Sequence, residues 1–396
     1  MGTGALGGLT SPPISDLDLW SREVLLDPWE EFRTIRDTAP VVYLERYDVY
    51  AVGRYRDVRG VLRDWQTFTS ADGVAFNDLM NEAEMGTAPG SDPPEHDAVR
   101  SAMLERLRLT EVRGLVDLVQ KRADEMVAEL VERGSFDLVT DLAQRFVTQV
   151  VGELIGLSGD RLARFGPAGP TFFDSTGPEG DLTYEAVPVA LELLQDIGRI
   201  TKDDMTPGSM GWSLFEAEAR GEIPADSTTM LIWNYIGPAF DTTINGIGST
   251  VWALVRDPEQ WKILKSEPEL IPSAFNEGLR METPISIWAR GCRNGADIDG
   301  VTIPPGSRMC VLIASANRDE RHYPDPDHYD VRRDPHDHVA FGHGIHSCVG
   351  SALARSEAHA VLGALVEQVT TMECGAPVRK PHNTTRGLHG LTMTVA

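Results

Sequence analysis

Apolar residues recur every three to four positions along most of the chain, the spacing of helices that bury one face. Gly- and Pro-rich breaks separate these stretches. The pattern predicts a mainly helical protein, with a long helix that begins at Asp226 and others over residues 28–38, 55–65, 110–134, 137–157, 182–202 and 351–369.

Strand-like alternation is confined to short segments. Residues 41–54 alternate and are rich in Val and Tyr, which predicts a β-hairpin. A further strand is expected over 311–316, and strands are expected over 383–395 near the C-terminus. We therefore expect small sheets beside a helical body.

Three segments interrupt or precede these elements. Residues 69–91 form a long stretch with several Gly and Pro breakers, and loops of this length are usually functional or disordered. Residues 165–180 are broken in the same way. Residues 1–15, rich in Gly, Ser and Pro, are expected to be flexible.

Charge, hydropathy and cysteine use narrow the class of protein. The net charge of −24 argues against nucleic acid or an anionic membrane as a partner. No early apolar segment resembles a secretion signal and no apolar run is long enough to span a bilayer, so a cytoplasmic location is expected. The four cysteines show no CxxC spacing, which argues against a zinc site or disulfide framework.

The most informative stretch is 341–350, which reads Phe-Gly-His-Gly-Ile-His-Ser-Cys-Val-Gly. Its glycines let the backbone turn tightly and approach a sulfur atom or a flat ring. The helix expected from 351 starts just after Cys348, so its positive dipole end would favour a thiolate there. Such a cysteine can hold haem iron, whereas the simpler reading is a buried packing cysteine in a Gly-rich turn.

Four motifs agree with the first reading: this loop, the helical pair Glu277-x-x-Arg280, the Asp-Pro-Pro opening of 92–100, and Asp241-Thr242 in the long helix. Together they resemble the cytochrome P450 family, bacterial soluble class, over essentially the whole chain. The resemblance implies a single haem-thiolate monooxygenase domain over 1–396, mainly α, with a helical bundle around the haem and small β-sheets. It implies haem b as cofactor and Cys348 as the axial ligand of its iron.

The resemblance also implies which residues frame the haem. Its propionates need charge-assisted hydrogen bonds. The implied donors and loop-shaping residues are His96, Arg100, Arg290, His346, Phe341, Gly342 and Gly350. On the residues alone, His96 and Arg100, four positions apart, also fit an ordinary solvated helix face.

The resemblance implies that Glu277 and Arg280 form a buried ionic network behind the haem. Arg318 is the candidate third member, from the segments 316–319 and 323–326, which resemble the meander of the family. Buried pairs of this kind specify geometry more than they stabilise. A bare Glu-x-x-Arg pattern is common in helices, and it gains weight here from the Thr283-Pro284 pair that follows.

Asp241 and Thr242 match the acid and alcohol of the family, and the resemblance implies that they supply protons during oxygen activation. A mid-helix Asp-Thr otherwise fits an exposed face. Pro238 departs from the family pattern. An internal proline removes a helical hydrogen bond and clashes with the carbonyl four residues back, here Asn234, so we expect a kink or bulge.

The resemblance places a substrate pocket beneath the 69–91 and 165–180 segments. The candidate lining residues are Val74, Phe76, Phe172, Phe173, Asn234, Pro238, Ile285, Trp288 and Leu388. For the residues of 69–91, an ordinary mobile surface loop is the alternative. Because side chains alternate along a strand, Ile285, Ile287 and Trp288 cannot all face the pocket, and we favour Ile285 and Trp288.

Within the family, segments 49–52, 241–246, 315–319 and 383–388 are similar to members that oxidise para-substituted benzoates. Those members bind the carboxylate with basic and hydroxyl side chains. Here Asp72 stands where a basic residue is expected, and Trp233-Asn234 replaces a polar pair. Since Asp72 would repel a carboxylate, we expect a small neutral or phenolic aromatic substrate, hydroxylated or O-dealkylated.

Electrons would come from a [2Fe-2S] ferredoxin and an NAD(P)H-dependent reductase. The basic cluster Arg106, Arg108 and Arg113 would dock this acidic partner, or it is simply a salt-bridged helix surface. Two other readings remain: a peroxide-driven peroxygenase, and a non-catalytic haem sensor or electron carrier. The Asp241-Thr242 pair argues against the sensor, which needs no timed proton delivery.

Overall fold

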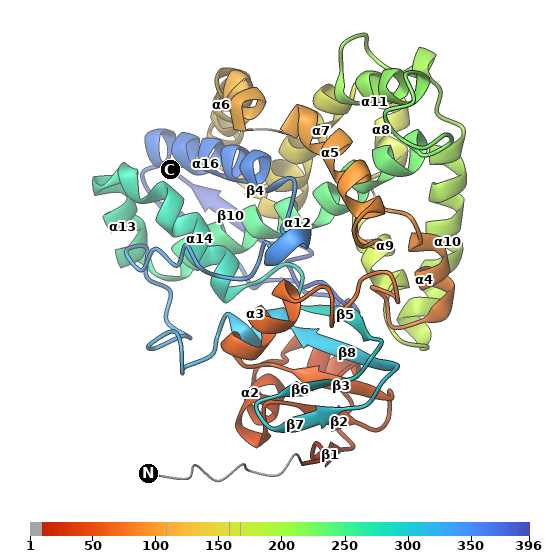
Figure 1. The fold of residues 1–396 in the computed structure, drawn as a ribbon. Coiled ribbons are helices and arrows are strands. Elements are labelled where there is room, and N and C mark those ends of the chain that lie inside the picture. The colour runs from red at the N-terminus through yellow and green to blue at the C-terminus, as the bar shows by residue number, and fades with distance from the viewer. Residues whose placement is uncertain (1–9, 108, 158, 167) are drawn as a thin grey trace, which may run out of the picture.

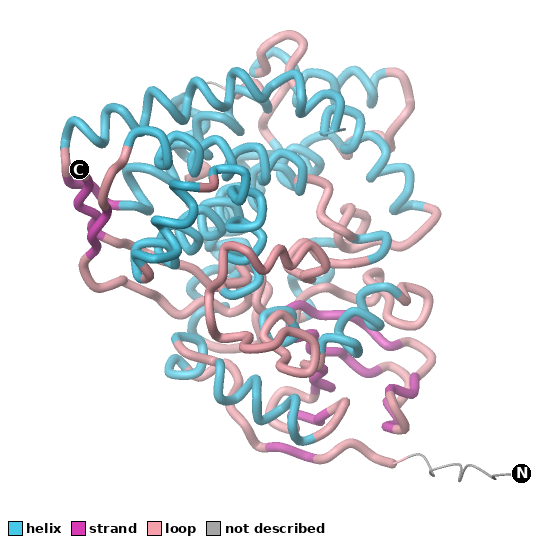
Figure 2. Tube along the Cα trace, turned by 90° about the vertical axis from the view of Figure 1, so that its left-hand side faces the viewer, coloured by secondary structure: helices cyan, strands magenta, loops and turns pink. Residues whose placement is uncertain are grey.

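A computed structural model of the chain describes residues 10–107, 109–157, 159–166 and 168–396 (Figure 1). Helices form one large body and a smaller sheet region lies below it, as the view turned by 90° also shows (Figure 2). The expected fold class, mainly α with small sheets, is confirmed.

The helices are α1 (Arg22–Leu26), α2 (Trp29–Thr38), α3 (Tyr55–Arg63), α4 (Asp78–Glu84), α5 (Glu95–Leu107), α6 (Leu109–Arg133), α7 (Arg145–Ile155), α8 (Gly159–Arg164), α9 (Ala168–Ser175), α10 (Asp181–Gly198), α11 (Met210–Ala219), α12 (Thr228–Arg256), α13 (Pro258–Ser266), α14 (Ile271–Met281), α15 (Ile313–Ala316) and α16 (Ser351–Gln368). Shorter turns of other helix types are η1 (Leu138–Gln144), η2 (Lys202–Asp204), η3 (Pro268–Leu270) and η4 (Gly344–His346).

The strands are β1 (Ile14–Ser15), β2 (Val42–Leu44), β3 (Val49–Val52), β4 (Ser135–Asp137), β5 (Ile287–Cys292), β6 (Ala296–Ile298), β7 (Val301–Ile303), β8 (Ser307–Leu312), β9 (Met372–Cys374) and β10 (Thr392–Val395). They form a five-stranded sheet in the order β1-β2-β3-β8-β5, a three-stranded sheet β4-β10-β9 and the pair β6-β7. The predicted hairpin is the antiparallel pair β2-β3. Residues 313–316, expected to continue a strand, form α15 instead.

The five-stranded sheet buries both of its faces. Side chains alternate along β8, so Met309 and Val311 pack with α3 on one face while Cys310 and Leu312 pack with α2 on the other. The sheet reaches into the segment that was expected to be flexible: Ile14 and Ser15 pair with β2, which corrects that expectation for residues 10–15. Residues 1–9 lie outside the described part of the chain.

Helix α12 runs through the middle of the helical body and packs against α7, α9, α14 and α16 (Figure 1). Most of its residues are buried, as its apolar sequence predicts. Its N-cap is Ser227, one residue after Asp226, where the helix was expected to begin. Asp226 itself adopts φ 62°, a left-handed conformation. The α-helix is continuous through Pro238, so the expected bulge is not present.

Helices α4, α9 and α10 lie on the same side of the helical body (Figure 1). The 69–91 loop is less irregular than its composition predicts, because Asn77 caps α4 by accepting a hydrogen bond from the Met80 amide. Among the described residues, no helix combines the length and apolar character needed to cross a bilayer.

Replacing Pro238 by Ala should raise the melting temperature. The new amide can donate to the Asn234 carbonyl, which recovers up to about 3 kcal/mol of unfolding free energy. Pro188→Ala, at an exposed interior position of α10, is the matched control and should also stabilise. For the oxidation that the resemblance implies, we expect Pro238→Ala alone to change the fraction of electrons that reach product; an unchanged fraction would contradict a role for Pro238 at the site.

Candidate functional site

A large cavity lies between α12, α5, β5 and the 341–350 loop. It encloses about 1750 Å³ of space between atoms, including its open mouth. Of the residues singled out from the sequence, the cavity is lined by Arg100, Phe172, Phe173, Asn234, Pro238, Thr242, Ile285, Trp288, Arg290, Phe341, Gly342, His346, Cys348 and Gly350. Segments that are far apart in the sequence therefore converge on one hollow.

The 341–350 loop is folded back on itself. The Cys348 amide donates to the Phe341 carbonyl over 2.8 Å, and Gly342 and Gly344 adopt φ of 70° and 78°. At Gly344 a Cβ would also lie 2.8 Å from the Leu62 carbonyl oxygen of α3. Glycine is required there for both reasons, and the tight turn directs Cys348 into the cavity.

The thiol of Cys348 faces opposing influences. Burial raises its pKa, whereas the Gly350 and Ser351 amides and the guanidinium groups of Arg100 and Arg355 lower it. Cys348 is exposed toward the cavity that it lines, so a group bound there can reach the sulfur. The start of α16 adds the positive end of a helix dipole. These features suit a thiolate that binds a metal.

Cationic side chains gather at the rim beside this loop. Arg290 on β5 is only 4% exposed, and its Nη1 donates to the Ala289 carbonyl, at 2.9 Å. Burial lowers the pKa of Arg290 to about 10 against the opposing charge of Asp92. Arg100 on α5 donates to the Ser347 carbonyl at 2.6 Å. Neither the half-buried guanidinium of Arg100 nor the buried one of Arg290 makes a direct ion pair with an acidic side chain among the described residues.

Two histidines complete the rim. His96 is 1% exposed, and its Nε2 has no hydrogen-bond partner within the described chain, while its Nδ1 lies 3.0 Å from Asp97 Oδ1. His346 contacts Ser70 Oγ at 3.1 Å, and burial together with Arg290 and His96 lowers its pKa to about 3. A buried ring nitrogen without a partner within the described chain, beside the cations of Arg100 and Arg290, fits the two carboxylates of a haem. The residues present therefore fit the implied cofactor.

The acid and the alcohol of α12 face different ways. Thr242 lines the cavity, and its hydroxyl donates to the Pro238 carbonyl at 2.9 Å. Asp241 is 5% exposed and does not line the cavity; its Oδ1 accepts a hydrogen bond from Asn245 at 3.0 Å. Burial raises the pKa of Asp241 to about 6, although His382 and Thr385 oppose the shift.

The aromatic candidates Phe172, Phe173 and Trp288 form one wall with Trp233. Ile287 instead packs into the cluster under the sheet, as strand alternation requires. Asn234 is 8% exposed, lines the cavity, and its Nδ2 has no partner within the described chain.

Three of the predicted lining residues do not line this cavity. Phe76 packs edge-on against Trp20, with ring centroids 4.8 Å apart, because its amide is tied to the Thr176 carbonyl just before α4. Val74 is buried outside the cavity lining, and Leu388 packs into the main core.

Sequence reasoning missed lining residues on α5 and in the loop before it. Met103 and Leu107 follow Arg100 at helical spacing, and all three line the cavity. Ala88 and Pro89 line it just before the Asp-Pro-Pro segment. The sequence does contain a signal for these residues, because Met103 and Leu107 are apolar and share the helix face of Arg100.

The repulsion of a carboxylate substrate that was expected from Asp72 is not supported by the position of this side chain. Both carboxylate oxygens of Asp72 accept hydrogen bonds from Arg293, one of them at 2.9 Å, and Asp72 does not line the cavity. Its charge is compensated at the surface and does not face a substrate. What remains is that the wall formed by α7, α9 and α12 carries no charged side chain among the described residues.

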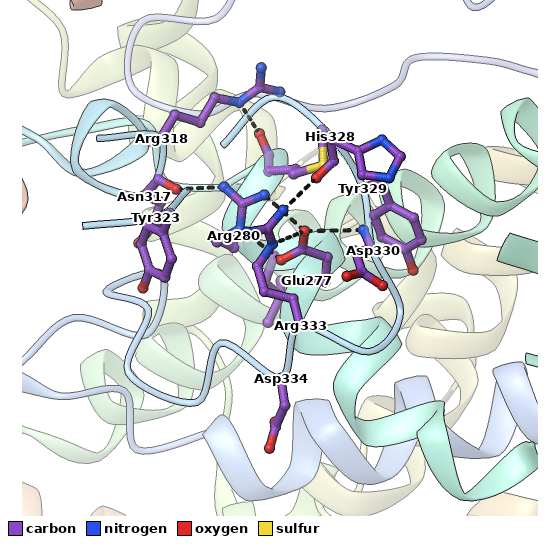
Figure 3. Close-up of polar contacts among 12 residues, drawn as sticks. Glu277, Arg280, Asn317, Arg318, Tyr323, His328, Tyr329, Asp330, Arg333 and Asp334 are labelled. Atoms are coloured by element: carbon purple, nitrogen blue, oxygen red, sulfur yellow. Dashed lines mark hydrogen bonds and ion pairs between the residues drawn. The ribbon is translucent and has the colours of Figure 1, made fainter. Parts of the chain in front are cut away.

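The ionic network is centred on Glu277 (Figure 3). Arg280 donates to both Glu277 oxygens at 2.7 and 2.9 Å and to the Asn317 carbonyl at 2.8 Å. The second arginine that pairs with Glu277 is Arg333, in the irregular segment between α15 and the 341–350 loop. Its Nε lies 2.9 Å from Glu277 Oε1. The prediction of Arg318 is wrong: Arg318 pairs with Glu282 at 3.2 Å and donates to the Met281 carbonyl.

The basic cluster expected to dock a partner cannot be placed. Arg108 lies outside the described residues, and so do the side chains of Arg106 and Arg113.

Comparisons with known proteins agree on one family. A family model described as Cytochrome P450 matches residues 210–389. The chain is 32% identical over 385 residues to cytochrome P450 CYP199A2 of Rhodopseudomonas palustris, covering 96% of this chain and 93% of that protein. It is 31% identical to the putative cytochrome P450 YjiB of Bacillus subtilis, over 88% of each chain.

Solved structures show the same likeness. That of cytochrome P450 CYP109Q5 from Chondromyces apiculatus has a TM-score of 0.79 at 27% identity, covering 96% of this chain and 98% of that one. That of CYP109B1 from Bacillus subtilis has a TM-score of 0.80 at 25% identity, covering 93% and 100%.

Replacing Glu277 by Gln should lower the free energy of unfolding by about 3–5 kcal/mol, because Arg280 and Arg333 would lose the charge they share in a buried site. Urea denaturation measures this. Glu259→Gln, in an exposed pair with Lys262, is the control and should leave stability nearly unchanged. Equal effects of the two substitutions would contradict the network's structural role.

Proposed function

Since the chain belongs to the cytochrome P450 family and is a haem-thiolate monooxygenase, we propose that it oxidises a small neutral or phenolic aromatic substrate by hydroxylation or O-dealkylation. The observation that carries this proposal is the wall formed by α7, α9 and α12, which is mainly apolar and aromatic, has no charged side chain among the described residues, and presents the Asn234 amide, whose Nδ2 has no partner within the described chain. When bound, haem b supplies the iron that activates dioxygen.

The protein's own residues would hold this cofactor from two directions. Cys348 would bind the iron as a thiolate, favoured by the Gly350 and Ser351 amides and by Arg100 and Arg355. Arg100, Arg290, His96 and His346 would bind the propionates with charge-assisted hydrogen bonds, at the rim where these side chains meet.

Asp241 and Thr242 would handle protons on the opposite side of the site. The Thr242 hydroxyl, held by the Pro238 carbonyl, faces the cavity and can orient a water or a reacting oxygen. Asp241 can deliver protons at neutral pH, because burial raises its pKa to about 6. After each delivery the carboxylate takes up a new proton at little cost, because this pKa lies close to neutral pH.

Substrate selection would rest on shape and one hydrogen bond. Phe172 and Trp288 supply aromatic surface that favours a flat ring. Asn234 Nδ2 needs an acceptor, and an ether, carbonyl or phenol oxygen supplies one. A carboxylate would be desolvated there without a cation to compensate it.

We also propose that electrons come from a [2Fe-2S] ferredoxin served by an NAD(P)H-dependent reductase. Arg59 and Arg63 are exposed on α3 beside the 341–350 loop, and Arg59 Nε lies 3.4 Å from His343 Nε2. On a chain with a net charge of −24, this local basic surface would attract an acidic partner to the side where Cys348 lies.

Cys348→Ala should abolish the absorbance that thiolate-ligated haem shows with carbon monoxide, together with substrate-dependent NAD(P)H consumption in the presence of ferredoxin and reductase. Cys374→Ala, at a half-buried cysteine outside the cavity, is the control and should retain both. Retention of the thiolate spectrum by Cys348→Ala would refute the assignment. Efficient turnover with peroxide alone would instead favour a peroxygenase.

The substrate proposal can be tested by titrating the haem spin state with 4-methoxyphenol and 4-methoxybenzoate. The phenol should bind more tightly, and tighter binding of the acid would contradict us. Asn234→Leu should weaken phenol binding by about tenfold, the value of roughly one hydrogen bond, because the leucine has no donor. Binding of 4-ethyltoluene, which has no oxygen, is the control and should not weaken.

A further inference from the structure

We infer that His382, paired with Asp174, passes protons from solvent to Asp241 through the hydroxyl of Thr385. This inference rests on the proposed role of Asp241. It concerns the side of Asp241 that faces away from the cavity, where the C-terminal segment packs against α9 and α12.

Two buried atoms are left without partners at this place. Asp241 Oδ2 and Thr385 Oγ1 both lack a hydrogen bond within the described chain, although the residues are 5% and 3% exposed. The hydroxyl of Thr385 nevertheless influences the Asp241 carboxyl, so the two groups lie near one another. Unpartnered buried oxygens are costly, and a water or a shared proton between them would satisfy both.

His382 joins this pair of oxygens to the outside. Its Nδ1 lies 2.9 Å from Asp174 Oδ2, and its side chain is 18% exposed. The other Asp174 oxygen accepts from the Asn383 amide at 2.8 Å, which fixes the carboxylate and through it the ring. His382 and Thr385 also border a second, smaller cavity of about 250 Å³ between atoms, behind the C-terminal segment.

The titratable groups around the imidazole are Asp174, Asp241, Lys380 and His389. Burial and Lys380 lower the pKa of His382, but the hydrogen bond to Asp174 and the two carboxylates raise it more. Asp241 has a pKa of about 6 and is influenced in turn by His382. The pKa of the donor is thus raised by its neighbours and the pKa of the acceptor is raised by burial, so His382 can hold a proton that the Asp241 carboxylate can accept.

The transfer conserves protons. The His382 imidazolium gives a proton across one water to the Thr385 hydroxyl, which gives its own proton to the Asp241 carboxylate. His382 is left as neutral imidazole and takes a new proton from solvent. Asp241 releases its proton toward the Thr242 side, and the relay returns to its starting state.

A purely structural role is the alternative, because Asp174 and Asn383 also tie α9 to the C-terminal segment. Two substitutions separate these roles. His382→Gln keeps a hydrogen bond to Asp174 but cannot carry a proton, and Thr385→Val keeps the shape of the side chain but has no hydroxyl. His389→Gln, at an exposed histidine of the same segment, is the matched control.

The first readout is turnover of the complete system with saturating substrate, in water and in deuterium oxide. We expect His382→Gln and Thr385→Val each to slow product formation about tenfold and to enlarge the solvent isotope effect, with substrate affinity within twofold of wild type. If either variant matches His389→Gln, the relay is refuted. If Asp241→Asn itself turns over normally, the proposed role of Asp241 fails instead.

The second readout does not depend on turnover. NMR titration of His382 in the reduced, carbon-monoxide-bound enzyme should show its pKa falling in Asp241→Asn, since a nearby negative charge is removed. His389 should titrate unchanged. An unchanged pKa of His382 would show that the two groups are not coupled and would overturn the inference.

Discussion

A single buried carboxylate, Glu277, holds the frame around the cavity together. It lies on α14 between the guanidinium groups of Arg280 and Arg333, and Arg280 also binds the Asn317 carbonyl at the end of α15. The Asp330 amide donates to the same carboxylate at 3.3 Å. One buried charge thus links α14, the end of α15 and the irregular segment that leads into the 341–350 loop (Figure 3).

That frame positions charges which the fold would not otherwise accept. The chain carries a large acidic excess, yet Arg290 is buried and Arg100 half-buried beside the loop, and neither makes a direct ion pair among the described residues. Burying a cation is unfavourable unless an anion joins it. The rim therefore suits a ligand with negative charge, whereas the wall formed by α7, α9 and α12 carries no charged side chain among the described residues.

The parts of the site that the sequence could predict are those set by local chain geometry. The 341–350 loop, the pair Glu277-Arg280 and the alternation of Ile287 with Trp288 depend on neighbours a few residues away, and these predictions agree with the structure. The helical body followed from the same kind of local spacing.

The parts that failed depend on contacts between distant segments. Arg333 rather than Arg318 reaches Glu277 because of the path of the meander, which no local pattern specifies. Asp72 accepts a hydrogen bond from Arg293, which is more than two hundred positions away, and the ring of Phe76 packs against that of Trp20. Such pairings emerge only from tertiary packing, so spacing rules cannot assign them.

The clamp between Asp174 and the C-terminal segment has a consequence for the order of events in catalysis. Asp174 belongs to α9, which also carries the aromatic side chains over the cavity. Asp174 Oδ2 lies 2.9 Å from His382 Nδ1, so a displacement of α9 that opened the cavity would separate Asp174 from the imidazole that it orients. In the inferred relay, proton delivery to Asp241 would then wait until the entrance has closed over a substrate, and reductant would not be consumed without product.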